Sequence, residues 1–170
     1  MELFTILTCG FLLLSREVGY LFAGEEYYDG IGILPVIAIS SYFAFMYSFP
    51  VNFEFFHKKT SIVAIGTTGC ALLNIGLNWL MIPKWGMYGA AIATALSYFA
   101  LFAAHYIIVH CLKGLKFHMK LAAFLPGLLA VGACIAVFYL LADFWYIRWG
   151  AGALLGVYEL YRIIKRKSIF

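Results

Sequence analysis

Six apolar stretches, each about as long as a membrane-spanning helix, take up most of this sequence. They run over 3–22, 31–56, 62–82, 87–112, 121–141 and 144–164. About 20 mainly apolar residues carry a helix across a bilayer, and continuous apolar runs are not typical of half-buried strands. Only 12% of the residues are charged, against roughly 25% in soluble domains. We therefore predict an all-α integral membrane protein with six transmembrane helices. The last helix is the weakest because it contains Arg148, Glu159 and Arg162.

The basic residues predict how these helices are oriented. With six spans both termini lie on one side, and that side collects most of the basic residues: Lys58, Lys59, Lys113, Lys116, Lys120, Arg162, Lys165, Arg166 and Lys167. The other side holds Arg16, Lys84 and Arg148. Because basic loops stay in the cytoplasm, we expect both termini there, in the bacterial cytoplasmic membrane. The net charge of +4 then indicates membrane topology rather than a nucleic-acid partner.

The loops between these stretches are too short to fold as domains, so any activity must lie within the helices or at their ends. The sequence has no phosphate-binding glycine loop, no GxSxG and no HExxH. The four cysteines are scattered singly through apolar stretches, which does not favour a metal site. We therefore expect neither an enzyme nor a cofactor. An intramembrane transferase is the enzyme alternative, but His57 and His118 lack a recognisable acidic partner.

Residues 73–98 contain the strongest local pattern, which predicts a helical hairpin. Asn74 and Asn78 are four apart and so share one helix face. They form either a polar wall of a substrate path or hydrogen bonds that hold the helices together. Pro83, Lys84 and Gly86 are typical of a tight turn. Small residues then recur every four positions and predict a face for close helix packing: Gly86, Ala90 and Thr94 on one strip, and Gly89, Ala93 and Ser97 on the next.

Two ionisable positions within the apolar stretches are candidates for a substrate path, because such residues are costly in a membrane. Glu54 follows Pro50 near the inner end of its stretch, and it either lines the path or is solvated or paired with Lys58. Arg16, next to Glu17, binds an anionic group, pairs with its neighbours or reaches the lipid headgroups. His105 has no carboxylate at helical spacing, so we interpret it as a satisfied histidine at a helix interface.

An ordered set of short patterns resembles a known family. The patterns are Asn74, Leu77 and Asn78, then 82–86 (IPKWG), then Gly89, Ala90, Ala91, Ala93 and Thr94, with 22–27 (FAGEEY), 33–35 (ILP) and 58–60 (KKT) upstream. Together they resemble polysaccharide flippases of the multidrug/oligosaccharidyl-lipid/polysaccharide exporter superfamily, which includes O-antigen flippases. The likeness covers 1–114, which would supply four spans. Residues 115–170 would add two further helices and a basic cytoplasmic tail.

The resemblance implies part of a MATE-like fold, in which two helix bundles surround a central cavity. Such proteins move lipid-linked oligosaccharides across the cytoplasmic membrane by alternating access, in the synthesis of cell-surface polysaccharides such as lipopolysaccharide. This chain would correspond to about the last six of 14 spans. A fragment, or one part of a split transporter, is therefore expected, with a separately encoded N-terminal half or a second copy as partner.

Two alternatives remain open. A multidrug or small-solute cation antiporter of the same superfamily needs a coupling carboxylate deep in a bundle, whereas the sequence places Glu54 near the inner end of its span. The chain is otherwise a fragment that transports nothing. In the leading interpretation Glu54, Asn74, Asn78 and Arg16 face the substrate path, and no covalent chemistry is involved.

Overall fold

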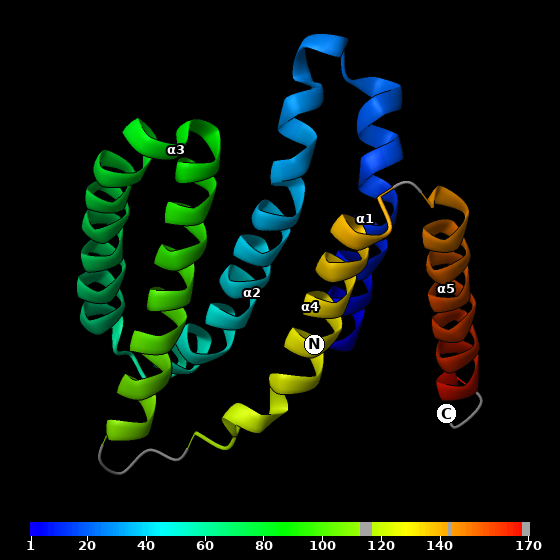
Figure 1. Ribbon diagram of the computed structural model, residues 1–170. Helices are drawn as coiled ribbons and strands as arrows, with labels where there is room; N and C mark the ends of the chain where they lie inside the picture. Colours follow the sequence, from blue (N-terminus) through cyan, green and yellow to red (C-terminus); the bar gives the residue numbers. More distant parts are fainter. Residues whose placement is uncertain (113–116, 143, 168–170) are drawn as a thin grey trace. The chain divides into compact units, whose positions relative to one another are not determined.

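The computed structural model describes residues 1–112, 117–142 and 144–167, and every regular element in these ranges is helical (Figure 1). This confirms the predicted all-α class. The elements in chain order are α1 (Glu2–Phe22), the 3₁₀ helix η1 (Glu25–Ile33), α2 (Leu34–Phe56), α3 (Thr60–Cys111), the short 3₁₀ helix η2 (Leu121–Ala123), α4 (Leu125–Leu140) and α5 (Trp145–Lys167).

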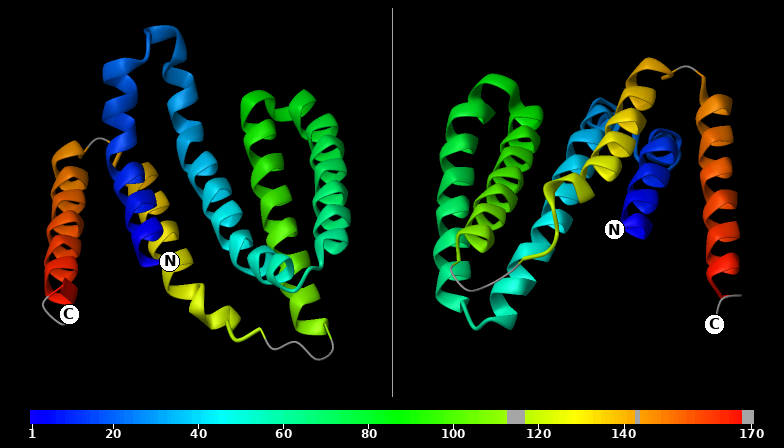
Figure 2. Two further views of the ribbon diagram at one scale, coloured as in Figure 1. Left: turned by 180° about the vertical axis from the view of Figure 1, so that it is seen from behind. Right: turned by 90° about the horizontal axis from the view of Figure 1, so that it is seen from below.

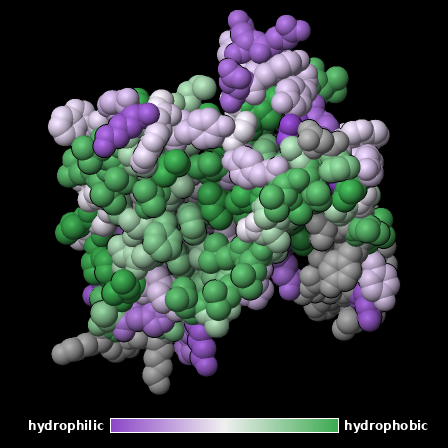
Figure 3. All heavy atoms as spheres, viewed as in Figure 1, coloured by the Kyte–Doolittle hydropathy of each residue, from purple (hydrophilic) through white to green (hydrophobic). Residues whose placement is uncertain are grey.

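Three helical segments are long and apolar enough to cross a membrane, judged by length and composition: Glu2–Phe22, Glu25–Phe56 and Thr60–Cys111. The helix α4 is apolar but shorter, at 16 residues. On the face shown in Figure 3, hydrophobic residues cover the middle of the α3 region and hydrophilic residues gather at its two ends. A lipid-facing surface explains this pattern, because the outward side chains need no partner in hydrocarbon. The number of crossings stays a prediction.

The 52-residue run of α3 is a hairpin that reverses at Gly86. Gly86 has φ 52° and ψ −128°, a conformation that only glycine adopts without strain. The first arm covers 60–85, and the second arm covers 87–111. Both figures of the ribbon show the two arms side by side (Figures 1 and 2). The turn predicted around Pro83 and Gly86 is confirmed at Gly86, while Pro83 lies inside the helical part of the first arm.

The chain divides into two compact units. The terminal unit comprises Met1–Pro35 and Leu125–Phe170, and the hairpin unit comprises Val36–Phe124. The boundary predicted at residue 114 marks the end of the family resemblance, so it is not a prediction of where these compact units meet. That boundary, together with Lys113 and Lys116 of the predicted basic loop, lies outside the described residues.

In the terminal unit, α1 packs against η1, α4 and α5. Leu12 and Leu13 of α1 are buried, as are Val131 and Phe138 of α4. The hydroxyl of Tyr139 donates a hydrogen bond of 2.8 Å to the carbonyl of Gly32, which ties α4 to η1. Apolar packing thus forms the centre of this unit, and a hydrogen bond joins α4 to η1.

In the hairpin unit, aromatic side chains link α2, the second arm of α3 and the segment that follows it. The rings of Phe43 and Phe99 lie 5.2 Å apart, which joins α2 to the second arm. Phe124 is fully buried and contacts Phe49 and Phe102 at 5.7 and 5.2 Å. Edge-on aromatic pairs of this kind stabilise a core beyond the area they bury.

Candidate functional site

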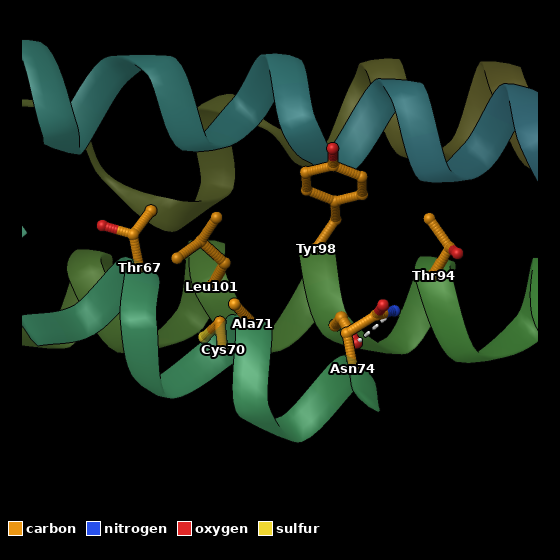
Figure 4. Close-up of a pocket in the computed structure, with 8 residues that line it drawn as sticks. Thr67, Cys70, Ala71, Asn74, Thr94, Tyr98 and Leu101 are labelled. Atoms are coloured by element: carbon orange, nitrogen blue, oxygen red, sulfur yellow. Dashed lines mark hydrogen bonds between the residues drawn. The ribbon is translucent and has the colours of Figure 1, made fainter. Parts of the chain in front are cut away.

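The hairpin unit contains a cavity of about 250 Å³ between the arms of α3 (Figure 4). Its lining is rich in uncharged polar groups and comprises Thr67, Cys70, Ala71, Asn74, Thr94, Ser97, Tyr98 and Leu101. In both arms the lining residues follow the spacing i, i+3, i+4 and i+7, which places them on one helix face. The cavity is therefore a direct consequence of two helix faces brought together by the turn at Gly86.

A short chain of hydrogen bonds runs along one side of this cavity. The side-chain amide of Asn78 donates to the side-chain oxygen of Asn74 at 3.0 Å. The amide of Asn74 donates across the hairpin to the hydroxyl of Ser97 at 3.1 Å, which in turn donates to the carbonyl of Ala93. The structure thus brings both predicted asparagines together. Asn74 ties the arms to each other and also lines the cavity. The predicted helix-joining hydrogen bond is therefore present, and the role in a substrate path stays a prediction.

The polar lining keeps hydrogen-bonding capacity for a ligand. Thr67 and Thr94 donate their hydroxyl protons to Val63 and Ala90 one turn back, which leaves their oxygen lone pairs as acceptors. The amide of Asn74 has a second N–H beyond the one given to Ser97. The cavity therefore offers acceptors and a donor without a charged side chain in its lining.

The small residues of the second arm play different parts. Ala93 is fully buried and Ser97 nearly so. A Cβ added to Gly89 would collide with the carbonyl of Met81, so the arms approach closely only because this position is glycine. Ala90 and Thr94 are half-buried. Gly86 contributes the turn rather than the packing face, since a Cβ built there meets nothing within 4 Å.

Glu54 lies in a buried pair with a residue of the second arm. Its Oε2 is 2.6 Å from Nδ1 of His105, and both side chains have no exposed surface. Neither Oε1 of Glu54 nor Nε2 of His105 has a hydrogen-bond partner. The ring of Tyr47 packs on the imidazole at 5.0 Å in an edge-on arrangement. Gly66 of the first arm allows the imidazole to fit, because a Cβ there would collide with Nε2.

This geometry corrects one interpretation of the sequence, that Glu54 is solvated or paired with Lys58, and it confirms that His105 lies at a helix interface. Glu54 is neither solvated nor paired with Lys58, which is exposed in the turn after α2. His105 does have a carboxylate partner, which comes from another helix rather than from helical spacing on its own. The available signal was a shared level in the predicted membrane, since both residues lie in the half of their predicted spans nearer the basic loops. The spacings i+3 and i+4 identify side chains that are neighbours on the same helix, so they cannot identify a partner on another helix.

The remaining candidate, Arg16, belongs to the terminal unit. It is half-buried, and its guanidinium lies 5.9 Å from the centre of the Tyr20 ring. Its neighbour Glu17 forms an ion pair with Arg148 of α5. Arg148 is 1% exposed, and its buried charge is compensated by a carboxylate from α1. Both charged residues are evident in the sequence, but no sequence pattern pairs Glu17 with Arg148.

Over the described ranges, no group of three or more His, Cys, Asp or Glu side chains lies close enough to hold a metal ion. The fold and the site thus define an all-helical protein with helices of membrane-spanning length, an uncharged polar cavity and a buried acid–imidazole pair. Comparison with family models, curated proteins and solved structures found no match for this chain.

Proposed function

We propose that this chain is part of a flippase that moves lipid-linked oligosaccharides across the bacterial cytoplasmic membrane by alternating access, in the synthesis of cell-surface polysaccharide. The observation that carries the proposal is the uncharged lining of the hairpin cavity. Sugar hydroxyls both donate and accept hydrogen bonds, and the cavity offers acceptors at Thr67 and Thr94 and a donor at Asn74. Tyr98 adds an aromatic face in the same lining.

The size of the cavity fits one part of a glycan. Pockets for drug-sized ligands span roughly 300–1,000 Å³, so about 250 Å³ accommodates about one sugar unit. A whole oligosaccharide needs further surface, which we assign to a separately encoded N-terminal half or to a second copy of this chain. This is the arrangement that the resemblance to the C-terminal part of such flippases implies.

Six spans with both termini in the cytoplasm complete the proposal. Each arm of α3 exceeds the roughly 20 residues that a crossing needs, so the hairpin would cross twice. Lys58 and Lys59 precede the first arm, while Lys84 lies next to the turn at its other end. The larger basic cluster marks the cytoplasmic end under the positive-inside rule, which puts the Gly86 turn outside.

Binding of a labelled lipid-linked oligosaccharide to the full chain in lipid nanodiscs tests the proposal, with the same lipid carrier without sugar as the reference ligand. We expect the glycan form to bind more tightly, and Thr94→Val to reduce that preference about fivefold, the loss expected for one hydrogen bond. Thr68→Val is the matched control, because Thr68 is exposed and outside the cavity. Binding makes the test independent of whether transport needs a partner.

Equal binding of the two lipids would contradict the proposal, as would equal effects of Thr94→Val and Thr68→Val. If the chain binds, reconstitution into vesicles then measures translocation as the fraction of labelled lipid that reaches the other leaflet. Unchanged translocation in Asn74→Ala would remove the cavity from the transport path.

One observation favours a second candidate, a cation antiporter of the same superfamily. Such a transporter needs a coupling carboxylate inside a bundle, and Glu54 is fully buried against His105 rather than lying at the surface. A lipophilic cation that binds the chain in competition with protons, together with no glycan preference, would support the antiporter over the flippase.

A further inference from the structure

The contact between Glu54 and His105 requires a proton between the two groups. Oε2 of a carboxylate and an unprotonated ring nitrogen are both acceptors, and two acceptors do not approach to 2.6 Å without a shared proton. That proton is supplied in one of two ways. Either a neutral imidazole donates its own N–H to a charged carboxylate, or the pair holds one additional proton and is neutral overall.

Burial decides between these two states. The first leaves a net negative charge in a site with no exposed surface, and an uncompensated buried charge costs several kcal/mol. The second has no net charge. Since no basic group contacts the free Oε1, nothing else in the described structure offsets the negative charge. The buried pair is therefore stable in the state that holds one additional proton and has no net charge.

The same two groups hold fewer protons once they are apart. In water near neutral pH, a glutamate is ionised and most histidines are neutral. Separating α2 from the hairpin hydrates both side chains, and together they then lack the additional proton. Packing of α2 on the hairpin and uptake of one proton are thus linked.

We propose that Glu54 and His105 form an occluded site for one proton, which is taken up when α2 packs against the α3 hairpin and released when α2 and the hairpin separate. The unpartnered Oε1 and Nε2 leave the pair without other hydrogen bonds to fix its charge. This inference concerns the chain itself and does not depend on which cargo the cavity binds. In an alternating-access cycle, it would couple movement of α2 to proton transfer.

The other titratable groups near the pair do not take up the additional proton in place of Glu54 and His105. Tyr47 of α2 faces the imidazole, and Cys70 of the first arm lies within electrostatic range of Tyr47. Both are neutral near pH 7 in their ordinary state. His57, in the turn just after α2, is half-buried, and its Nδ1 contacts the carbonyl of Phe53 at 2.9 Å.

The test measures how pH changes the ratio of two populations, namely chains in which α2 is packed on the α3 hairpin and chains in which it is separated from it. Spin labels are placed at Ser41 on α2 and Leu72 on the first arm, both exposed, in a full chain whose four cysteines are replaced by alanine. Increasing amounts of a denaturing detergent in mixed micelles drive the separation at each pH, so both states are always populated. The label distance reports the ratio.

The wild-type ratio should be flat between roughly pH 5 and 6, where a separated histidine also carries a proton, and fall about tenfold per pH unit above roughly pH 6.5. Glu54→Gln makes the buried pair neutral without the extra proton. Its ratio should be flat above roughly pH 6.5 and fall below it, because only the separated histidine then takes up a proton.

His105→Gln provides a second, independent variant. Its buried Glu54 must be protonated, so the fall should begin at roughly pH 4.5 and remove the wild-type plateau. His110→Gln is the matched control, since His110 lies exposed on the same arm, and it should keep the wild-type profile. A wild-type ratio that is flat above pH 6.5, or a Glu54→Gln profile equal to wild type, would overturn the proposal.

Discussion

Among the described residues, each unit of this protein contains one acid–base pair with a buried base, and the two pairs differ in that base. In the terminal unit Glu17 pairs with Arg148, which is 1% exposed. In the hairpin unit Glu54 pairs with His105, and neither has any exposed surface. A guanidinium stays charged at every physiological pH, whereas an imidazole changes charge within it. The first pair is therefore a permanent ion pair, and the second can gain or lose a proton.

Burial alone does not define the role of a charged pair between apolar helices. A permanent pair holds helices together at any pH but cannot respond to a change in pH. A pair that takes up a proton on burial has a strength that depends on pH.

Arg148→Met should have the largest effect on stability, about 3 kcal/mol, because it leaves the largely buried carboxylate of Glu17 without its partner. The double variant Glu17→Leu with Arg148→Met should recover most of the loss, since no unpaired charge remains. Reversible unfolding in mixed detergent micelles measures both. A double variant as unstable as the single one would show that the ion pair is not the reason.

His105→Leu should cost less, about 2 kcal/mol near pH 5, because Glu54 can neutralise itself by taking a proton while still leaving unsatisfied polar atoms. The cost should grow between roughly pH 4.5 and 6.5, where the wild type still holds its plateau, and level off above roughly pH 6.5. The cost of the double variant Glu17→Leu with Arg148→Met should stay constant over the same range, because it leaves no group of the pair to titrate. The same unfolding measurement at several pH values compares the two. Parallel pH profiles for both variants would remove the distinction between the pairs.

Gly66→Ala should disturb the hairpin pair by about 1–2 kcal/mol, because its Cβ would collide with the His105 imidazole. Gly69→Ala on the same arm is the matched control, with nothing within 4 Å of its Cβ. In the terminal unit, the Cβ of Gly152→Ala would meet Leu13 at an ordinary distance of 3.8 Å. Both controls should unfold like the wild type, and a loss in either that equals the loss in Gly66→Ala would contradict the predicted clash.

Asn74→Ala should have the smallest effect, about 1 kcal/mol, because it removes two hydrogen bonds of about 0.6 kcal/mol each in a membrane. The loss should be independent of pH, since the amide does not titrate. Asn52→Ala is the control, as Asn52 is exposed on α2. Equal losses in the two variants would show that the contact between the arms adds no stability.

The sequence predicted the helices well because continuous apolar runs and a glycine turn are local signals. The reversal at Gly86 and the close approach at Gly89 follow from residue types at fixed spacing. The hydrogen bond from Asn74 to Ser97 was also within reach, since both sit on the predicted packing faces of one hairpin.

The buried pairs were missed because they join helices that are distant in sequence. Glu54 and His105 are 51 positions apart, and Glu17 and Arg148 are 131 apart. Helical spacing identifies neighbours on one helix but not on two. The cost of an isolated charge in an apolar span was the available signal, and it indicated that each charge needs a partner without identifying which one.

The most direct test of the difference between the pairs measures both units in parallel. One chain carries labels at Ser41 and Leu72 in the hairpin unit, and another carries them at the exposed Leu7 and Leu154 on α1 and α5. Between pH 6.5 and 8.5, the packed-to-separated ratio should fall about a hundredfold in the hairpin unit and stay constant in the terminal unit. Equal pH dependence in the two units, whether flat or falling, would contradict the account.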